Sequence, residues 1–110
     1  MERITASLVT SDLVDGIETL GFSETQSGDG RYVILEKGAD DETIYLEIDD
    51  QINSGYDAVD GYSVKEGRVE LSLMKPVGKV EILTLLIEYP ASEAVLVEDT
   101  LGRFFGRPGS

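Results

Sequence analysis

The chain has 110 residues with 22 acidic and nine basic side chains, a net charge of −13, and neither cysteine nor histidine. This length suits one domain, residues 1–110, that can bury an ordinary hydrophobic core. Disulfides and thiolate metal sites are excluded, and the usual general base near pH 7 is missing. We therefore expect no enzyme and no cofactor.

The acidic balance also bears on partners and location. A negative chain is repelled by phosphate backbones and anionic membranes, so direct binding to nucleic acid or membrane is disfavoured. The N-terminal residues lack the charged and apolar regions of a secretory signal. The longest apolar stretch, residues 82–87, is too short to cross a bilayer. We therefore expect a cytoplasmic protein.

Composition and turn residues predict strands in the first third of the chain. Residues 4–10 are rich in Ile, Val and Thr, which is typical of a strand. Residues 11–12 are expected to turn the chain, and residues 16–22 to return as a second strand. Residues 23–30 form a polar loop with two glycines. The next strand, residues 32–35, shows little alternation, which favours a central position in the sheet.

The middle of the chain holds the clearest strand pattern. Residues 38–42 form an acidic turn, and residues 43–49 then alternate between apolar and polar side chains. This period of two predicts one side facing the core and one facing solvent. The core side holds Ile44, Leu46 and Ile48, and the solvent side holds Tyr45, Glu47 and Asp49. Residues 51–55 are expected as a loop.

Three further strands are predicted next. Residues 56–64 form an irregular strand, and the pair Glu66-Gly67 is a hairpin signal. Residues 69–73 follow with alternate side chains pointing inward. Residues 79–89 form the longest strand, and its second half is apolar on both faces. We expect that half to be covered on both sides.

The C-terminal residues change to helical spacing. Over residues 93–105, apolar side chains recur three and four positions apart, at Val97, Leu101, Phe104 and Phe105. Ser92 is the predicted N-cap, and Gly106 is expected to end the helix. The apolar face is expected to pack on the sheet, and a helix that binds a partner is the alternative. The predicted fold class is α+β, an antiparallel β-sheet of about 6–7 strands with one C-terminal helix.

Acidic side chains concentrate in one part of the chain. Residues 36–60 hold nine acids and a single base, Lys37, a net of −8. Tyrosine supplies rigid contact area, amides adapt their hydrogen bonds, and carboxylates steer a basic partner, so we expect a partner-binding surface. Its predicted residues are Tyr45, Glu47, Asp49, Asp50, Gln51, Asn53, Tyr56, Asp57 and Asp60. The alternative is an ordinary exposed strand and turn, in which Tyr56 covers the core.

A calcium- or ligand-binding loop at residues 49–60 is the second interpretation. Positions one, three, five and twelve of a calcium loop are filled by Asp49, Gln51, Asn53 and Asp60. Position six requires glycine but holds Ser54, and the flanking segments are predicted as strands rather than helices. We therefore predict no metal ligands.

A third interpretation is a structural or regulatory subunit whose edge strand pairs with itself, so we expect a monomer or a weak homodimer.

The same stretch, residues 44–56, carries the most specific pattern in the chain. It resembles the immunity protein 10 family of bacterial polymorphic toxin systems, in which a strand of the form Y-x-E-x-x-D-Q runs into N-S-x-Y-G-G. The matching residues are Tyr45, Glu47, Asp50, Gln51, Asn53, Ser54 and Tyr56. Asp57 and Ala58 stand where the family has two glycines. A looser similarity covers residues 32–105.

This resemblance implies a cytosolic antidote. Such a protein binds a cognate toxin domain and blocks its activity, so the implied partner is a toxin domain. Many toxins of this kind are nucleases with basic substrate clefts, and an acidic inhibitor fits such a cleft in place of a phosphate backbone.

Overall fold

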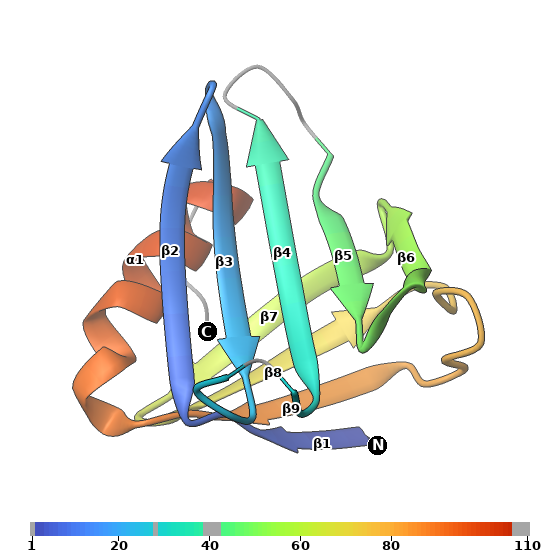
Figure 1. The fold of residues 1–110 in the computed structure, drawn as a ribbon. Coiled ribbons are helices and arrows are strands. Elements are labelled where there is room, and N and C mark those ends of the chain that lie inside the picture. The colour runs from blue at the N-terminus through green and yellow to red at the C-terminus, as the bar shows by residue number, and fades with distance from the viewer. Residues whose placement is uncertain (1, 28, 39–42, 107–110) are drawn as a thin grey trace.

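The protein folds as two β-sheets and one helix, and the computed structural model describes residues 2–27, 29–38 and 43–106 (Figure 1). The five-stranded sheet is an antiparallel meander in the order β2-β3-β4-β5-β6. Its strands are β2 (Leu8–Val14), β3 (Ile17–Ser23), β4 (Tyr32–Gly38), β5 (Tyr45–Ile48) and β6 (Asp50–Tyr56).

The four-stranded sheet has the order β1-β9-β8-β7. Its strands are β1 (Glu2–Thr5), β7 (Val59–Lys65), β8 (Arg68–Leu73) and β9 (Thr84–Glu88). β1 pairs with β9 in parallel, and the other neighbours are antiparallel. A 3₁₀ turn (Ala91–Glu93) leads into α1 (Ala94–Phe105). In the part of the chain described, no helix is both long and apolar enough to span a membrane.

One hydrophobic core joins the two sheets and the helix. The five-stranded sheet contributes Leu20, Phe22, Val33, Leu35, Leu46 and Ile48, all of them fully buried. They form one cluster with side chains of β8, β9 and α1, including Leu71, Ile87 and Leu101. In Figure 1 the four-stranded sheet and α1 lie behind the five-stranded sheet. The front face of the five-stranded sheet therefore has no layer of described residues packed over it.

Several features of the fold confirm the predictions from the sequence. The class is α+β with one C-terminal helix among the described residues. β4 is the middle strand of its sheet, and β9 is buried on both faces through Leu85, Leu86 and Ile87. The apolar face of α1 is buried, and Gly106 ends the helix with a φ of +73°.

The strand count and the first turn differ from the predictions. The described residues form nine strands in two sheets rather than 6–7 in one. One additional strand arises because residues 4–10 split at Ala6 and Ser7 into β1 and β2 of different sheets, and another because residues 51–55 lie in strand β6. The turn expected at residues 11–12 lies at Asp15 and Gly16, whose positive φ values are typical of the tight turns that join two strands. Residues 11–12 are part of β2 instead.

Three further corrections concern element ends. Residues 51–55 belong to a strand, β6, rather than to a loop. β9 begins at residue 84 instead of 79. The helix N-cap is Glu93 without a side-chain hydrogen bond, because the 3₁₀ turn already starts the helical path and makes a Ser92 cap unnecessary. The acidic turn predicted at residues 38–42 falls mostly outside the described residues.

A close contact between β6 and the segment before β9 depends on Gly78. Its φ is +58°, and a Cβ atom there would lie 2.1 Å from the carbonyl oxygen of Ile52. Gly16 also has a positive φ, +79°, but a Cβ there would meet nothing within 4 Å. Both glycines have a left-handed backbone conformation, but only at Gly78 would an added Cβ atom clash with a neighbouring strand.

We expect Gly78→Ala to lower the free energy of unfolding by about 2 kcal/mol more than Gly16→Ala, since only the first adds overpacking to the strain of a left-handed backbone. Urea unfolding of both variants measures the difference. Equal losses would contradict the close approach at Gly78.

Candidate functional site

The uncovered face of the five-stranded sheet carries three of the nine predicted site residues, Tyr45, Glu47 and Tyr56. We call it the open face. Strand alternation gives its members, which lie opposite the buried side chains of β2 to β6. They are Leu8, Thr10, Asp12, Val14, Ile17, Thr19, Gly21, Ser23, Tyr32, Ile34, Glu36, Gly38, Tyr45, Glu47, Ser54 and Tyr56. Within these described strand positions there is no lysine or arginine.

One row of this face crosses all five strands. The register pairs Asp12 with Thr19, Thr19 with Glu36, Glu36 with Tyr45, and Tyr45 with Tyr56. Side chains directly opposite each other in neighbouring strands lie close enough to interact. The row therefore brings two carboxylates and two tyrosines into one line.

Glu47 lies beside this row and is buried although its sheet face is open. The residue retains only 8% exposure, and both carboxylate oxygens are hydrogen-bonded. The Tyr32 hydroxyl donates to Oε2 and the Tyr45 hydroxyl to Oε1, each at 2.5 Å. Ile34 and Ser54 flank Glu47 on the neighbouring strands. A buried carboxylate is tolerated when hydrogen bonds replace its lost hydration, and two phenols do so here.

The two phenols are held in the neutral, donating form. Burial first, and then the hydrogen bond to Glu47, raise the pKa of Tyr32. For Tyr45 the hydrogen bond to Glu47 is the main cause of a raised pKa. A phenolate beside a carboxylate would lose the donated proton and place two negative charges together. The cluster of Tyr32, Tyr45 and Glu47 thus fixes the orientation of the Tyr45 ring.

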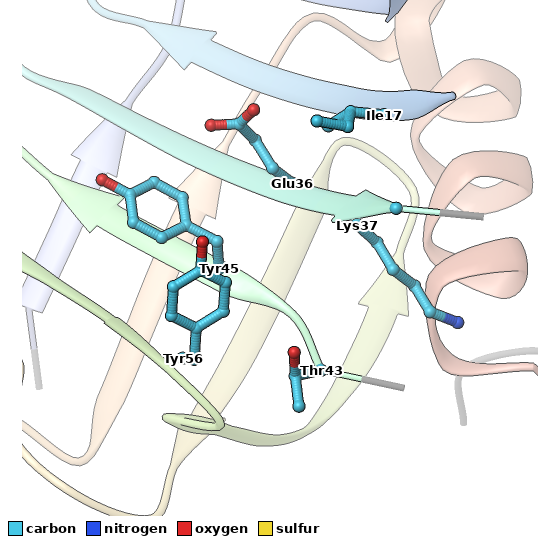
Figure 2. A pocket seen from close by; sticks show the side chains of 7 residues that line it. Ile17, Glu36, Lys37, Thr43, Tyr45 and Tyr56 are labelled. Carbon is cyan, nitrogen blue, oxygen red and sulfur yellow. The ribbon is translucent and has the colours of Figure 1, made fainter. Parts of the chain in front are cut away.

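A hollow of about 120 Å³ lies at the Tyr56 end of the row (Figure 2). It is lined by Ile17, Glu36, Gly38, Thr43, Tyr45 and Tyr56, together with Lys37. The rings of Tyr45 and Tyr56 are tilted by 55° with centroids 5.4 Å apart. Figure 2 shows the Lys37 side chain pointing away from both rings, toward the helix.

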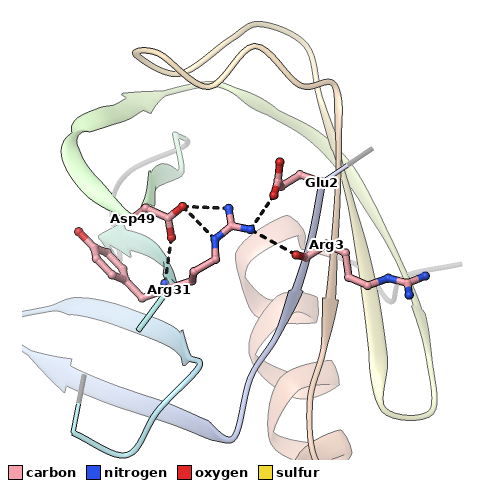
Figure 3. Close-up of polar contacts among 5 residues, drawn as sticks. Glu2, Arg3, Arg31 and Asp49 are labelled. Carbon is pink, nitrogen blue, oxygen red and sulfur yellow. Dashed lines mark hydrogen bonds and ion pairs between the residues drawn. The ribbon is translucent and has the colours of Figure 1, made fainter. Parts of the chain in front are cut away.

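Asp49 has a structural role at the edge of the sheet (Figure 3). Its Oδ1 accepts from the backbone N–H of Tyr32, and its Oδ2 accepts from Nε and Nη2 of Arg31 at 3.2 and 2.9 Å. The same guanidinium donates to Glu2 at 2.6 Å and to the carbonyl of Arg3 at 3.4 Å. Arg31 therefore connects the β5–β6 turn to β1 in the other sheet.

The remaining predicted site residues separate into two groups. Asp50, Gln51 and Asn53 organise β6: Asp50 accepts from the backbone N–H of Ile52, the Gln51 carbonyl accepts from Ser54, and Asn53 Oδ1 accepts from the Lys79 N–H at 2.9 Å. Asp57 and Asp60 lie away from the open face. They border a separate hollow of about 300 Å³ beside the end of α1, with Phe104 and Phe105 among its walls.

Two site predictions need correction. The alternation predicts Glu47 in solvent, but it is buried because Tyr32 and Tyr45 cover it. The same alternation predicts Asp49 on the face of Tyr45 and Glu47, but the register shifts after Glu47 and Asp49 takes a φ of +64° in the tight turn to β6. Residues 49–56 therefore form a turn and strand β6 instead of the calcium-binding loop that the second interpretation requires. Among the described residues no three acidic side chains gather as a metal site.

Sequence reasoning missed Asp12, Tyr32 and Glu36 as members of the same face. It placed Asp12 in a turn and ended the strand of Tyr32 at residue 35, before Glu36. Extending the predicted strand of residues 32–35 by one residue would have placed Glu36 on the side of Tyr32 and Ile34, opposite Val33 and Leu35, because successive side chains of a strand point to opposite faces. The strands that pair with the strand of Tyr32 and Glu36 are known only from the register of the sheet in the structure.

Comparison with known proteins assigns the chain to no family. No model of a protein family matches the chain, and no curated protein is significantly similar to it in sequence. The resemblance of residues 44–56 to immunity proteins therefore stays a prediction.

The hydrogen bonds of Glu47 should matter for stability. We expect Glu47→Ala to lower the free energy of unfolding by about 3 kcal/mol, because it leaves two phenols without their charged acceptor. Glu70→Ala on β8 is the control, where an exposed strand carboxylate is removed, and should cost about 0.5 kcal/mol or less. Chemical unfolding of both variants checks this, and similar losses would contradict a special role for Glu47.

The raised pKa of Tyr45 predicts a response to alkaline pH. A folded-state pKa above the unfolded value of 10.0 gives stability that is fully present below pH 10 and is lost as pH rises through the folded pKa. Glu47→Gln should lower the pKa of Tyr45 because it removes the main cause of the shift. The Cζ chemical shift of Tyr45, followed by NMR against pH, gives the pKa in both proteins. An unchanged midpoint would show that Glu47 does not control this phenol.

Proposed function

We propose that this protein is a non-enzymatic antidote that binds and inhibits a cognate toxin domain through its acidic open face. The observation that carries the proposal is the composition of that face. It presents Tyr45, Tyr56, Asp12 and Glu36 on one side of a sheet, with no lysine or arginine among its described positions. Such a surface favours a partner with a basic surface.

The physical properties of the face support tight binding. Tyrosines contribute large contact areas with few freely rotating bonds, and they are enriched at the centres of interfaces. The sheet and the Glu47 hydrogen bonds hold Tyr45 in place before binding, which lowers the entropy cost of association. Carboxylates on an uncovered face attract a basic partner during diffusion.

The toxin as partner rests on the resemblance of residues 44–56. The matched residues serve the proposed surface in two ways. Tyr45 and Tyr56 supply contact area, and Glu47 fixes Tyr45. Asn53 and Ser54 hold the backbone of β6, on which Tyr56 stands. The proposal includes a cytoplasmic location, a one-to-one complex and a basic toxin domain, of which a nuclease is one class.

A rescue experiment tests the proposal directly. The C-terminal domain encoded by the gene immediately upstream is induced in a bacterial host with and without this protein. We expect the domain to arrest growth and this protein to restore it. Arrest that persists with this protein present, or a harmless upstream domain, would count against the antidote function.

Charge reversal then tests the surface. Glu36→Lys on β4 should slow association with the partner and weaken rescue, whereas Glu70→Lys on β8 should leave both unchanged. Both variants change an acidic strand residue by the same charge, and only Glu36 lies on the open face. Reversal of Asp49 would be a poor choice, because it would break the Arg31 contacts.

Salt gives an independent check on the same complex. The association rate should fall severalfold from about 0.01 to 0.15 M salt, since the screening length shortens from about 30 Å to about 8 Å. Equal effects of Glu36→Lys and Glu70→Lys, or a rate independent of salt, would remove the open face as the docking surface.

A further inference from the structure

The hollow on the open face combines an aromatic wall with a carboxylate. Tyr45 and Tyr56 form the wall, with ring centroids 5.4 Å apart. Glu36 stands opposite Tyr45 in the register and lines the same hollow. Ile17 adds an apolar side, although 46% of its surface is exposed. Figure 2 shows these side chains around one space.

We propose that this hollow is a receptor for a single arginine side chain of the protein partner. The guanidinium stacks on Tyr45 and Tyr56 and bonds the carboxylate of Glu36. The proposal deepens the proposed function and rests on it only for the source of the arginine. The receptor itself is a property of this chain and is testable without the partner.

The electrostatics of the hollow favour a cation. The negative face of a tyrosine ring attracts a cation placed within about 6 Å of its centre, and Glu36 adds a full charge. Lys37, the base nearest in sequence, directs its amine away from the rings (Figure 2). Asp12 extends the negative charge along the same row. An anion or a neutral apolar group would gain none of these electrostatic contacts.

The chemistry favours arginine over lysine. A guanidinium is planar, so it can stack on a ring while its edge N–H groups reach a carboxylate. Glu36 keeps acceptor capacity for them, because Thr19 donates to its Oε2 at 3.3 Å and a carboxylate has about four acceptor positions. An ammonium is a compact, strongly hydrated charge and loses more water on entering a half-open aromatic site.

The hollow is organised before any ligand arrives. The Tyr45 hydroxyl donates to Glu47, which also accepts from Tyr32 and is itself buried. The ring of Tyr45 is therefore fixed at its hydroxyl end. Tyr56 is 60% exposed, which leaves much of its surface available for stacking.

The test is an NMR titration of the full-length, ¹⁵N-labelled protein with N-acetyl-L-arginine amide. We expect saturable shifts in the amide signals around Glu36, Tyr45 and Tyr56. N-acetyl-L-citrulline amide, a neutral compound of nearly the same shape, should bind at least about tenfold more weakly, because it lacks the charge. N-acetyl-L-lysine amide should also bind more weakly. Citrulline or lysine amide binding as well as arginine amide would overturn the assignment.

Three variants locate the site. Glu36→Gln and Tyr56→Ala should each weaken arginine amide binding by about tenfold, since one removes the charged acceptor and the other half of the aromatic wall. Asp12→Asn removes a charge from the same row outside the hollow and should change binding by about twofold or less. Unchanged binding in both Glu36→Gln and Tyr56→Ala would show that the hollow is not the receptor.

The titration and the rescue experiment separate the two proposals. A protein that rescues growth but does not bind arginine amide keeps its proposed function and loses the receptor. A protein that binds arginine amide in the hollow but neutralises no toxin keeps the receptor and loses the antidote function.

Discussion

Leu20, Phe22, Leu35 and Leu46 project from one side of the five-stranded sheet into a core shared with the four-stranded sheet and α1. This packing determines which residues face outward, because successive side chains of a strand point to opposite faces of the sheet. Because alternate side chains of β2 to β5 pack into the core, the residues between them point to the opposite face of the sheet. No described element covers that side, so its composition is free to serve a purpose other than packing.

Glu47 is an exception on the open face, because its neighbours bury its carboxylate. Burial of a charge without hydrogen-bond partners would be unfavourable. Hydrogen bonds from Tyr32 and Tyr45 compensate for the lost hydration and link β4 to β5 by side chains as well as by backbone. The same bonds determine where the Tyr45 ring stands, so a stabilising interaction also orients a side chain of the proposed binding surface.

Residues 44–56 have more than one physical role. Tyr45 and Tyr56 pair across β5 and β6 and present their rings on the open face. Asn53 forms a hydrogen bond that holds the backbone of β6 in place. The acidic residues near this stretch also have different roles. Asp49 binds Arg31 and ties the two sheets together, whereas Glu36 remains on the surface where a cation can reach it.

Local periodicity in the sequence was enough to establish the α+β class, the C-terminal helix, the central position of β4 and the inward side of β8. It could not reveal that residues 4–10 divide between two sheets, because the whole segment has the composition of a single strand. It could not reveal that residues 51–55 pair with β5, because this polar strand at the sheet edge lacks an alternating pattern. Strand pairing in the folded protein brings Asp12 and Glu36 into line with Tyr45 and Tyr56. Register between strands distant in sequence is set by turns, bulges and core packing together, and no single segment encodes it.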